Sequence, residues 1–168
     1  MLTLVYISIV STLLATVLIV ALRPLAIRLQ LVDRPSGRKT HKGEIPLIGG
    51  PVIWLVVMTG IIFVIPNPQW SIVFACTMLV MLGIIDDRQP IPARFKLFFH
   101  ISAATIVVVG ENLYIDDIGI FHEIFIMSSF SVLHKVIAVI AIAAAINAFN
   151  FIDGIDGLSA SMALLAMT

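Results

Sequence analysis

Long apolar runs alternate with short polar segments along the 168-residue chain. Residues 1–22 and 45–85 contain no Asp, Glu, Lys or Arg. A helix needs about 20 apolar residues to cross the ~30 Å hydrocarbon core of a bilayer, so the second stretch is long enough for two such helices. The pattern therefore predicts an all-α, polytopic transmembrane helical bundle.

Five complete spans and the start of a sixth are expected. Their ranges are 2–22, 47–65, 70–85, 93–110 and 132–151, with the sixth apolar segment beginning at 158. Proline removes a backbone N–H and disfavours helix in the residue before it. We therefore expect Arg23-Pro24 to close the first span and Pro66–Gln69 to separate the second from the third. Residues 1–168 are interpreted as the N-terminal half of a membrane-embedded domain.

The composition agrees with a membrane protein. The chain is 60% hydrophobic and 12% charged, whereas a typical soluble domain is about 45–50% apolar and about 25% charged. These values exclude a disordered chain, a basic nucleic-acid-binding protein and an ordinary soluble domain. The single cysteine, Cys76, cannot form an intrachain disulfide.

Basic residues are concentrated in alternate loops. Every Lys and Arg except Lys135 lies in the loops 23–44 and 86–96, and none lies in 66–69 or 111–131. Loops rich in Lys and Arg face the cytoplasm in most membrane proteins. We therefore expect an N-terminus outside the membrane and a cytoplasmic polar segment after the fifth span.

Two adjacent carboxylates, Asp86 and Asp87, end an apolar run without a polar transition. Two such charges 4 Å apart repel by about 4 kcal/mol at an effective dielectric of 20, so a cation beside them is favoured. Mg²⁺ is typically held by one or two carboxylates together with substrate phosphates. The alternative is a solvated helix end in which Arg88 is the partner.

A second polar group follows the fifth span. Asn147 and Asn150, and then Asp153 and Asp156, are each three residues apart, a spacing that places side chains on one face of a helix. Amides and carboxylates at membrane depth are costly unless they line a site or a water-filled cavity. The alternative is a polar helix end capped by Gly154.

A cationic cluster lies between the first two spans, and includes Lys39 and His41. Cations beside a phosphate–Mg²⁺ site would stabilise the charge that develops during phosphoryl transfer. Plain positive-inside topology is the alternative explanation. His100, inside the fourth span, is interpreted as a buried, hydrogen-bonded packing residue.

Taken with their order and spacing, these segments resemble the polyprenyl-phosphate N-acetylhexosamine-1-phosphate transferases, glycosyltransferase family 4. The similarity is carried by these motifs: Asp33-Arg34-Pro35, Arg38-Lys39-Thr40-His41, Ile45–Gly50, Asp86-Asp87 and Asn147–Leu158. The bacterial undecaprenyl-phosphate N-acetylglucosamine-1-phosphate transferases of WecA type are the most similar, and the MraY-type phospho-MurNAc-pentapeptide transferases are an alternative within the family.

The resemblance implies a reaction and its participants. N-acetylglucosamine-1-phosphate, or a related hexosamine-1-phosphate, would pass from a UDP-sugar to undecaprenyl phosphate in the bacterial inner membrane. UMP would leave, and the product would start cell-envelope polysaccharide synthesis. Mg²⁺, with Mn²⁺ as a substitute, is the implied cofactor.

The same resemblance assigns roles to individual residues. The implied catalytic residues are Asp86, Asp87, Asp153 and Asp156; the implied substrate-binding residues are Lys39, His41 and Asn147; the implied metal ligands are Asn150 and Asp87.

The family's later half carries a further aspartate loop and a histidine-rich loop that are absent from these 168 residues. We therefore expect the N-terminal half of a transferase, inactive alone, whose protein partner is a second copy or a separate C-terminal half. Two other classes stay open: a small ion or proton transporter lined by aspartates, and a non-catalytic membrane partner. A transporter would place ionisable groups near the bilayer midplane, whereas these cluster at one face.

Overall fold

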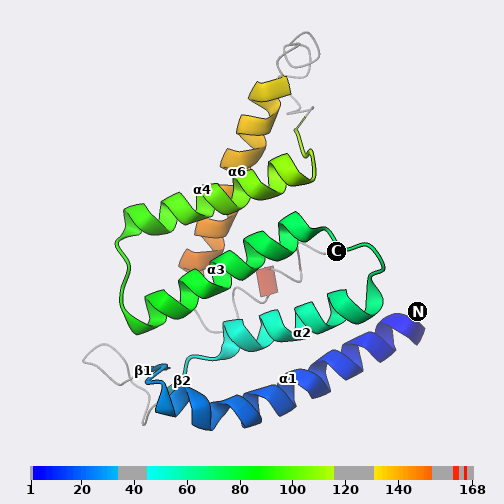
Figure 1. The fold of residues 1–168 in the computed structure, drawn as a ribbon, viewed down its shortest axis with the longest axis vertical. Coiled ribbons are helices and arrows are strands. Elements are labelled where there is room, and N and C mark those ends of the chain that lie inside the picture. Colours follow the sequence, from blue (N-terminus) through cyan, green and yellow to red (C-terminus); the bar gives the residue numbers. More distant parts are fainter. Residues whose placement is uncertain (1, 34–44, 116–130, 153–160, 163–164, 166–168) are drawn as a thin grey trace. The chain divides into compact units, whose positions relative to one another are not determined.

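The computed structural model describes residues 2–33, 45–115, 131–152, 161–162 and 165. The described helices are α1 (Leu2–Arg28), α2 (Gly49–Val64), α3 (Trp70–Arg88), α4 (Ala93–Gly110) and α6 (Ser131–Ile152), and the strands are β1 (Val32–Asp33) and β2 (Ile45–Pro46) (Figure 1). The chain forms two compact units, Met1–Ile91 and Pro92–Thr168.

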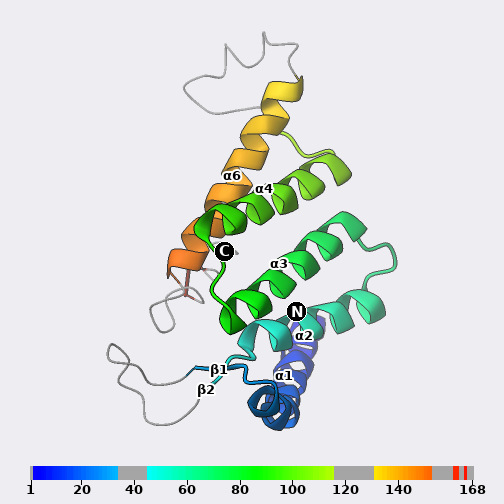
Figure 2. The same ribbon diagram turned by 60° about the vertical axis from the view of Figure 1, so that its left-hand side comes forward.

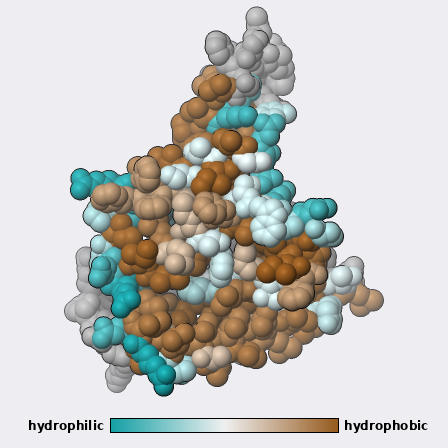
Figure 3. All heavy atoms as spheres, viewed as in Figure 1, coloured by the Kyte–Doolittle hydropathy of each residue, from teal (hydrophilic) through white to brown (hydrophobic). Residues whose placement is uncertain are grey.

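The expected fold class is confirmed. Four of the described helices, α1, α3, α4 and α6, are long and apolar enough to cross a membrane, and α2 is a shorter apolar helix. The apolar side chains on their outer faces are widely exposed, for example Ile62 at 67% and Phe63 at 83%, and they cover much of the face in Figure 3. Such surfaces suit contact with lipid rather than water. The expected sixth segment from 158 lies mostly outside the described residues.

The first helix is longer than predicted. Pro24 lies inside α1, which continues to Arg28, so the expectation that Arg23-Pro24 closes this span is wrong. The helix ends where Gln30 adopts a positive φ of 58° and the N–H of Leu31 bonds the carbonyl of Ala26 at 2.9 Å. This 6→1 hydrogen bond satisfies a carbonyl at the helix end. The cap, rather than the proline, therefore sets the end of the helix.

A two-stranded antiparallel ladder joins the ends of α1 and α2. Val32 pairs with Pro46 and Asp33 with Ile45, and the N–H of Leu47 donates to the carbonyl of Leu31 at 2.9 Å. Beside the ladder, a small core forms around Ala26, Ile48 and Val52. The ladder thus holds together the two ends of the segment 34–44.

Helices α4 and α6 of the second unit pack through small side chains. Ala103 and Ala104 on α4, and Ala138 and Ala143 on α6, are buried, and both views show the two helices crossing (Figures 1 and 2). Small residues let membrane helices approach closely, so that backbone and side-chain atoms gain van der Waals contact. The two buried alanines of α6 are therefore explained by packing.

Candidate functional site

Asp86 and Asp87 lie in the last turn of α3. The helix was expected to end at Ile85 but continues to Arg88, so the carboxylates belong to the helix rather than to the loop after it. Consecutive residues of an α-helix point about 100° apart. The two side chains accordingly differ, since Asp86 is half-buried and Asp87 is exposed.

A hydrogen bond holds the carboxylate of Asp86. Its Oδ1 accepts the backbone N–H of Ile91 at 2.8 Å, across the turn that contains Gln89 and Pro90. The N–H of Gln89 also bonds the carbonyl of Ile85 at 2.8 Å. The turn after α3 therefore fixes the orientation of Asp86, while Asp87 presents its side chain at the surface of its unit.

Asn147 and Asn150 lie in the last two turns of α6. The Nδ2 of Asn147 donates to the carbonyl of Ala143 at 2.8 Å, and the side chain is half-buried, whereas Asn150 is exposed. The bond made by Asn147 uses an amide N–H. The amide oxygens of both residues are the atoms suited to a hard cation such as Mg²⁺.

The other predicted site residues, Lys39, His41, Asp153 and Asp156, lie outside the described residues. Lys39 and His41 belong to the segment whose two ends are paired by β1 and β2. Asp153 follows α6 directly. Within the described ranges, no group of three or more His, Cys, Asp or Glu side chains is placed to hold a metal ion. The described carboxylates and amides are distributed over the two units, with Asp86 and Asp87 in the first and Asn147 and Asn150 in the second.

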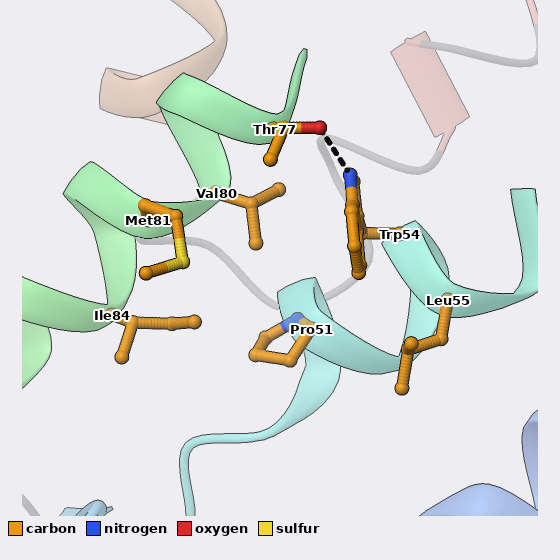
Figure 4. A pocket seen from close by; sticks show the side chains of 7 residues that line it. All are labelled: Pro51, Trp54, Leu55, Thr77, Val80, Met81 and Ile84. Atoms are coloured by element: carbon orange, nitrogen blue, oxygen red, sulfur yellow. Dashed lines mark hydrogen bonds between the residues drawn. The ribbon is translucent and has the colours of Figure 1, made fainter. Parts of the chain in front are cut away.

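The structure reveals a pocket that the sequence did not indicate. It lies between α2 and α3 and has a volume of about 140 Å³ (Figure 4). Its lining consists of Pro51, Trp54, Leu55, Thr77, Val80, Met81 and Ile84. The Nε1 of Trp54 donates to the Oγ1 of Thr77 at 3.1 Å. In the sequence, Trp54 and Thr77 are recognisable only as polar atoms inside apolar runs. The packing of α2 against α3 brings the two side chains together.

His100 is buried, with 6% of its surface exposed, as expected of a packing residue. Its Nδ1, however, has no hydrogen-bond partner among the described residues. The expectation of a hydrogen-bonded histidine is thus not met at this atom.

The comparisons with known proteins decide the family. The model of glycosyl transferase family 4 matches residues 69–168, more than half of the chain. The chain belongs to glycosyl transferase family 4. The matched region of this family 4 chain contains Asp86, Asp87, Asn147, Asn150, Asp153 and Asp156, and excludes Lys39 and His41.

Several curated proteins are similar to the chain. All are named undecaprenyl-phosphate alpha-N-acetylglucosaminyl 1-phosphate transferase. The protein of Yersinia pestis is 34% identical over 101 residues, which make up 58% of this chain and 27% of the relative. The protein of Salmonella typhi is 33% identical over 110 residues, which make up 62% of this chain and 29% of the relative. The protein of Pasteurella multocida is 35% identical over 102 residues, which make up 58% of this chain and 28% of the relative. The match thus spans less than a third of each relative. No solved structure matches the chain.

Proposed function

We propose that this chain contributes the site that transfers N-acetylglucosamine-1-phosphate, or a related hexosamine-1-phosphate, from a UDP-sugar to undecaprenyl phosphate. The observation that carries the proposal is the family match over residues 69–168. This match contains both the carboxylate pair at the end of α3 and the amide and carboxylate residues that begin near the end of α6. The relatives' names supply the acceptor lipid and the sugar.

The reaction exchanges one phosphoanhydride bond for another. A phosphate oxygen of the lipid attacks the β-phosphorus of the UDP-sugar, a new P–O bond forms, and the bond to the UMP oxygen breaks. The products are a lipid diphosphate sugar and UMP. Because both reactants are anionic, a site for this reaction has to offset negative charge that grows at the leaving oxygen.

The donor atoms suit Mg²⁺, since carboxylate and amide oxygens are hard ligands. The residues that the family resemblance implies as its ligands are Asp87 and Asn150. When bound, Mg²⁺ would neutralise charge on the diphosphate. Mn²⁺ would substitute.

The remaining residues have separate tasks in this proposal. Asp86, oriented by the N–H of Ile91, orients or deprotonates the lipid phosphate. Asp153 and Asp156 serve the nucleotide and the metal ion, as the family resemblance implies. Asn147 contacts the substrate through its amide. Lys39 and His41 bind the phosphates as cations or hydrogen-bond donors.

The topology that accompanies this function places the loops 23–44 and 86–96 on the cytoplasmic side of a bacterial inner membrane. The N-terminus is then outside, and the site faces the soluble UDP-sugar. Cysteine accessibility tests this arrangement directly. A single cysteine at Gln89, in a C76A background, should react with a thiol reagent only when the cytoplasmic side is exposed. A single cysteine at Asn67 should react from the opposite side, and labelling of both from one side would contradict the topology.

The activity is tested in membranes from cells that express the complete reading frame. Radiolabelled UDP-N-acetylglucosamine and undecaprenyl phosphate should yield a labelled lipid and an equal amount of UMP. A chelator should abolish both products, and added Mg²⁺ should restore them. Labelling from UDP-MurNAc-pentapeptide instead would reassign the donor to the MraY type. Proton or ion flux without labelled lipid would support the transporter and overturn the proposal.

A further inference from the structure

His100 brings a polar atom into a helix interface that is otherwise built from small apolar side chains. It lies on α4 with 6% of its surface exposed, and it is the only buried polar or charged side chain in the described part of the chain. Its Nδ1 bonds no other described residue. An unpaired buried polar atom typically costs about 1–3 kcal/mol, and an ionisable residue inside a membrane helix usually marks a function. Packing of α4 against α6 alone therefore does not account for this imidazole.

The buried residues of the two helices indicate what His100 faces on α6. Both views show α6 running back across α4 in the opposite direction (Figures 1 and 2). The buried Ala104 and Ala143 belong to this contact. One turn back along α4 from Ala104 is His100, and one turn forward along α6 from Ala143 is the half-buried Asn147. In an antiparallel pair these two steps lead to the same level, and residues four apart share a helix face, so His100 and Asn147 are expected opposite each other.

The amide of Asn147 makes a bond that is easily exchanged. Its Nδ2 donates to the carbonyl of Ala143 at 2.8 Å, within its own helix. That carbonyl also accepts the backbone N–H of residue 147 in the i→i−4 pattern of an α-helix, so it stays satisfied when the side chain turns away. Local bonds of this kind give a helix no extra stability. The Nδ2 of Asn147 can therefore leave Ala143 for a partner on α4 at little cost.

We propose that His100 is a positioning residue for Asn147. When substrate binds, the Nδ1 of His100 accepts a hydrogen bond from the Nδ2 of Asn147, and the amide Oδ1 is directed at the substrate. A neutral imidazole accepts at Nδ1 when its proton is on Nε2. The inference rests on the proposed function, in which Asn147 contacts the substrate. It adds a buried residue that acts on the substrate only through that amide.

The adjacency of the two positions is tested without any transfer activity. In a C76A background, which removes the single cysteine of the sequence, the pair H100C/N147C should be joined by a short bifunctional thiol reagent. Mass spectrometry of the digested protein detects the linked peptides. The matched control is H100C/A144C, because position 144 lies on the exposed side of α6, and it should give no link. Absence of a link between positions 100 and 147, or equal linking of both pairs, would overturn the proposal.

The positioning role is tested by the kinetics of transfer in membranes. Residues that orient a ligand-binding side chain typically contribute about 10–100-fold, so H100L should raise the KM for the UDP-sugar at least about tenfold. The kcat should change little, as is usual when uniform binding is lost. H100N keeps an acceptor near the position of Nδ1 and should restore the KM to nearly the parent value. A purely structural defect would instead reduce the amount of active protein, which lowers the apparent kcat and leaves the KM unchanged.

N147A separates this inference from the proposed function. It should raise the KM as H100L does, and H100L/N147A should raise it no further, because His100 acts only through Asn147. Additive effects in the double variant, or an unchanged KM in H100L, would overturn the positioning role and leave the proposed function standing. An unchanged KM and full transfer in N147A would remove Asn147 from the site, and this inference would then fail together with that assignment.

Discussion

The α2–α3 pair and the α4–α6 pair pack through side chains of different size. Between α2 and α3, Trp54 crosses to Thr77, and the bulky ring leaves an apolar pocket beside it. Between α4 and α6, buried alanines allow close approach. The treatment of buried polar atoms also differs, since the indole N–H of Trp54 is satisfied whereas the Nδ1 of His100 has no partner among the described residues. Side-chain size therefore decides whether a helix pair leaves space for another molecule.

The largest effect on stability is expected at the alanine interface. A143L introduces a large side chain at a position that is 4% exposed, and overpacking of this kind typically costs about 1–3 kcal/mol. The neighbouring A144L, on the exposed side of the same helix, is the matched control and should be nearly neutral. Unfolding of the purified protein in mixed micelles measures both. Equal stability of the two variants would show that α4 and α6 are not closely packed.

A smaller effect is expected from the polar link of the other pair. T77V keeps the shape of the side chain but removes the acceptor of the Trp54 N–H, and hydrogen bonds between membrane helices contribute about 0.6 kcal/mol on average and up to about 2 kcal/mol. We expect a loss in that range and a changed Trp54 emission maximum. T59V is the control, because the Thr59 hydroxyl donates to the Leu55 carbonyl of its own helix at 2.8 Å and so does not link α2 to α3. An unchanged emission spectrum in T77V would contradict the link.

The smallest change is expected at His100. Replacing a buried group that lacks a partner by an apolar one can be neutral or stabilising, so H100L should change the free energy of unfolding by less than about 1 kcal/mol. H100N, which keeps a polar group near the position of Nδ1, should be no more stable than H100L. A loss of more than about 2 kcal/mol in H100L would show that the imidazole has a partner.

The two pairs also show what can be predicted from the sequence. Apolar runs locate the helices well, because burial in a membrane requires about 20 apolar residues in succession, and α4 occupies the expected range 93–110. Helix ends are less predictable. α1 passes Pro24 and stops at the cap formed around Gln30, which depends on local hydrogen bonds rather than on composition. The pocket beside Trp54 depends on which helices become neighbours, and a single sequence does not reveal this.

The candidate site also combines features that the sequence predicts with features that it does not. The positions of Asp86, Asp87, Asn147 and Asn150 at helix ends follow from the boundaries of apolar runs. The bond from the Ile91 N–H to Asp86 does not, because it requires the specific turn through Gln89 and Pro90. That bond orients the carboxylate of Asp86.

The transfer of sugar phosphate by a D87N variant tests the central claim most directly. Asparagine keeps the size of the side chain but removes the charge. Formation of labelled lipid from UDP-N-acetylglucosamine should therefore fall at least about 100-fold, a typical cost of removing one charge-stabilising group from an active site. D117N, in the acidic segment 111–131, is the control and should retain full transfer, with both variants inserted in the membrane to the same level. Full transfer by D87N would contradict the assignment of the site to the end of α3.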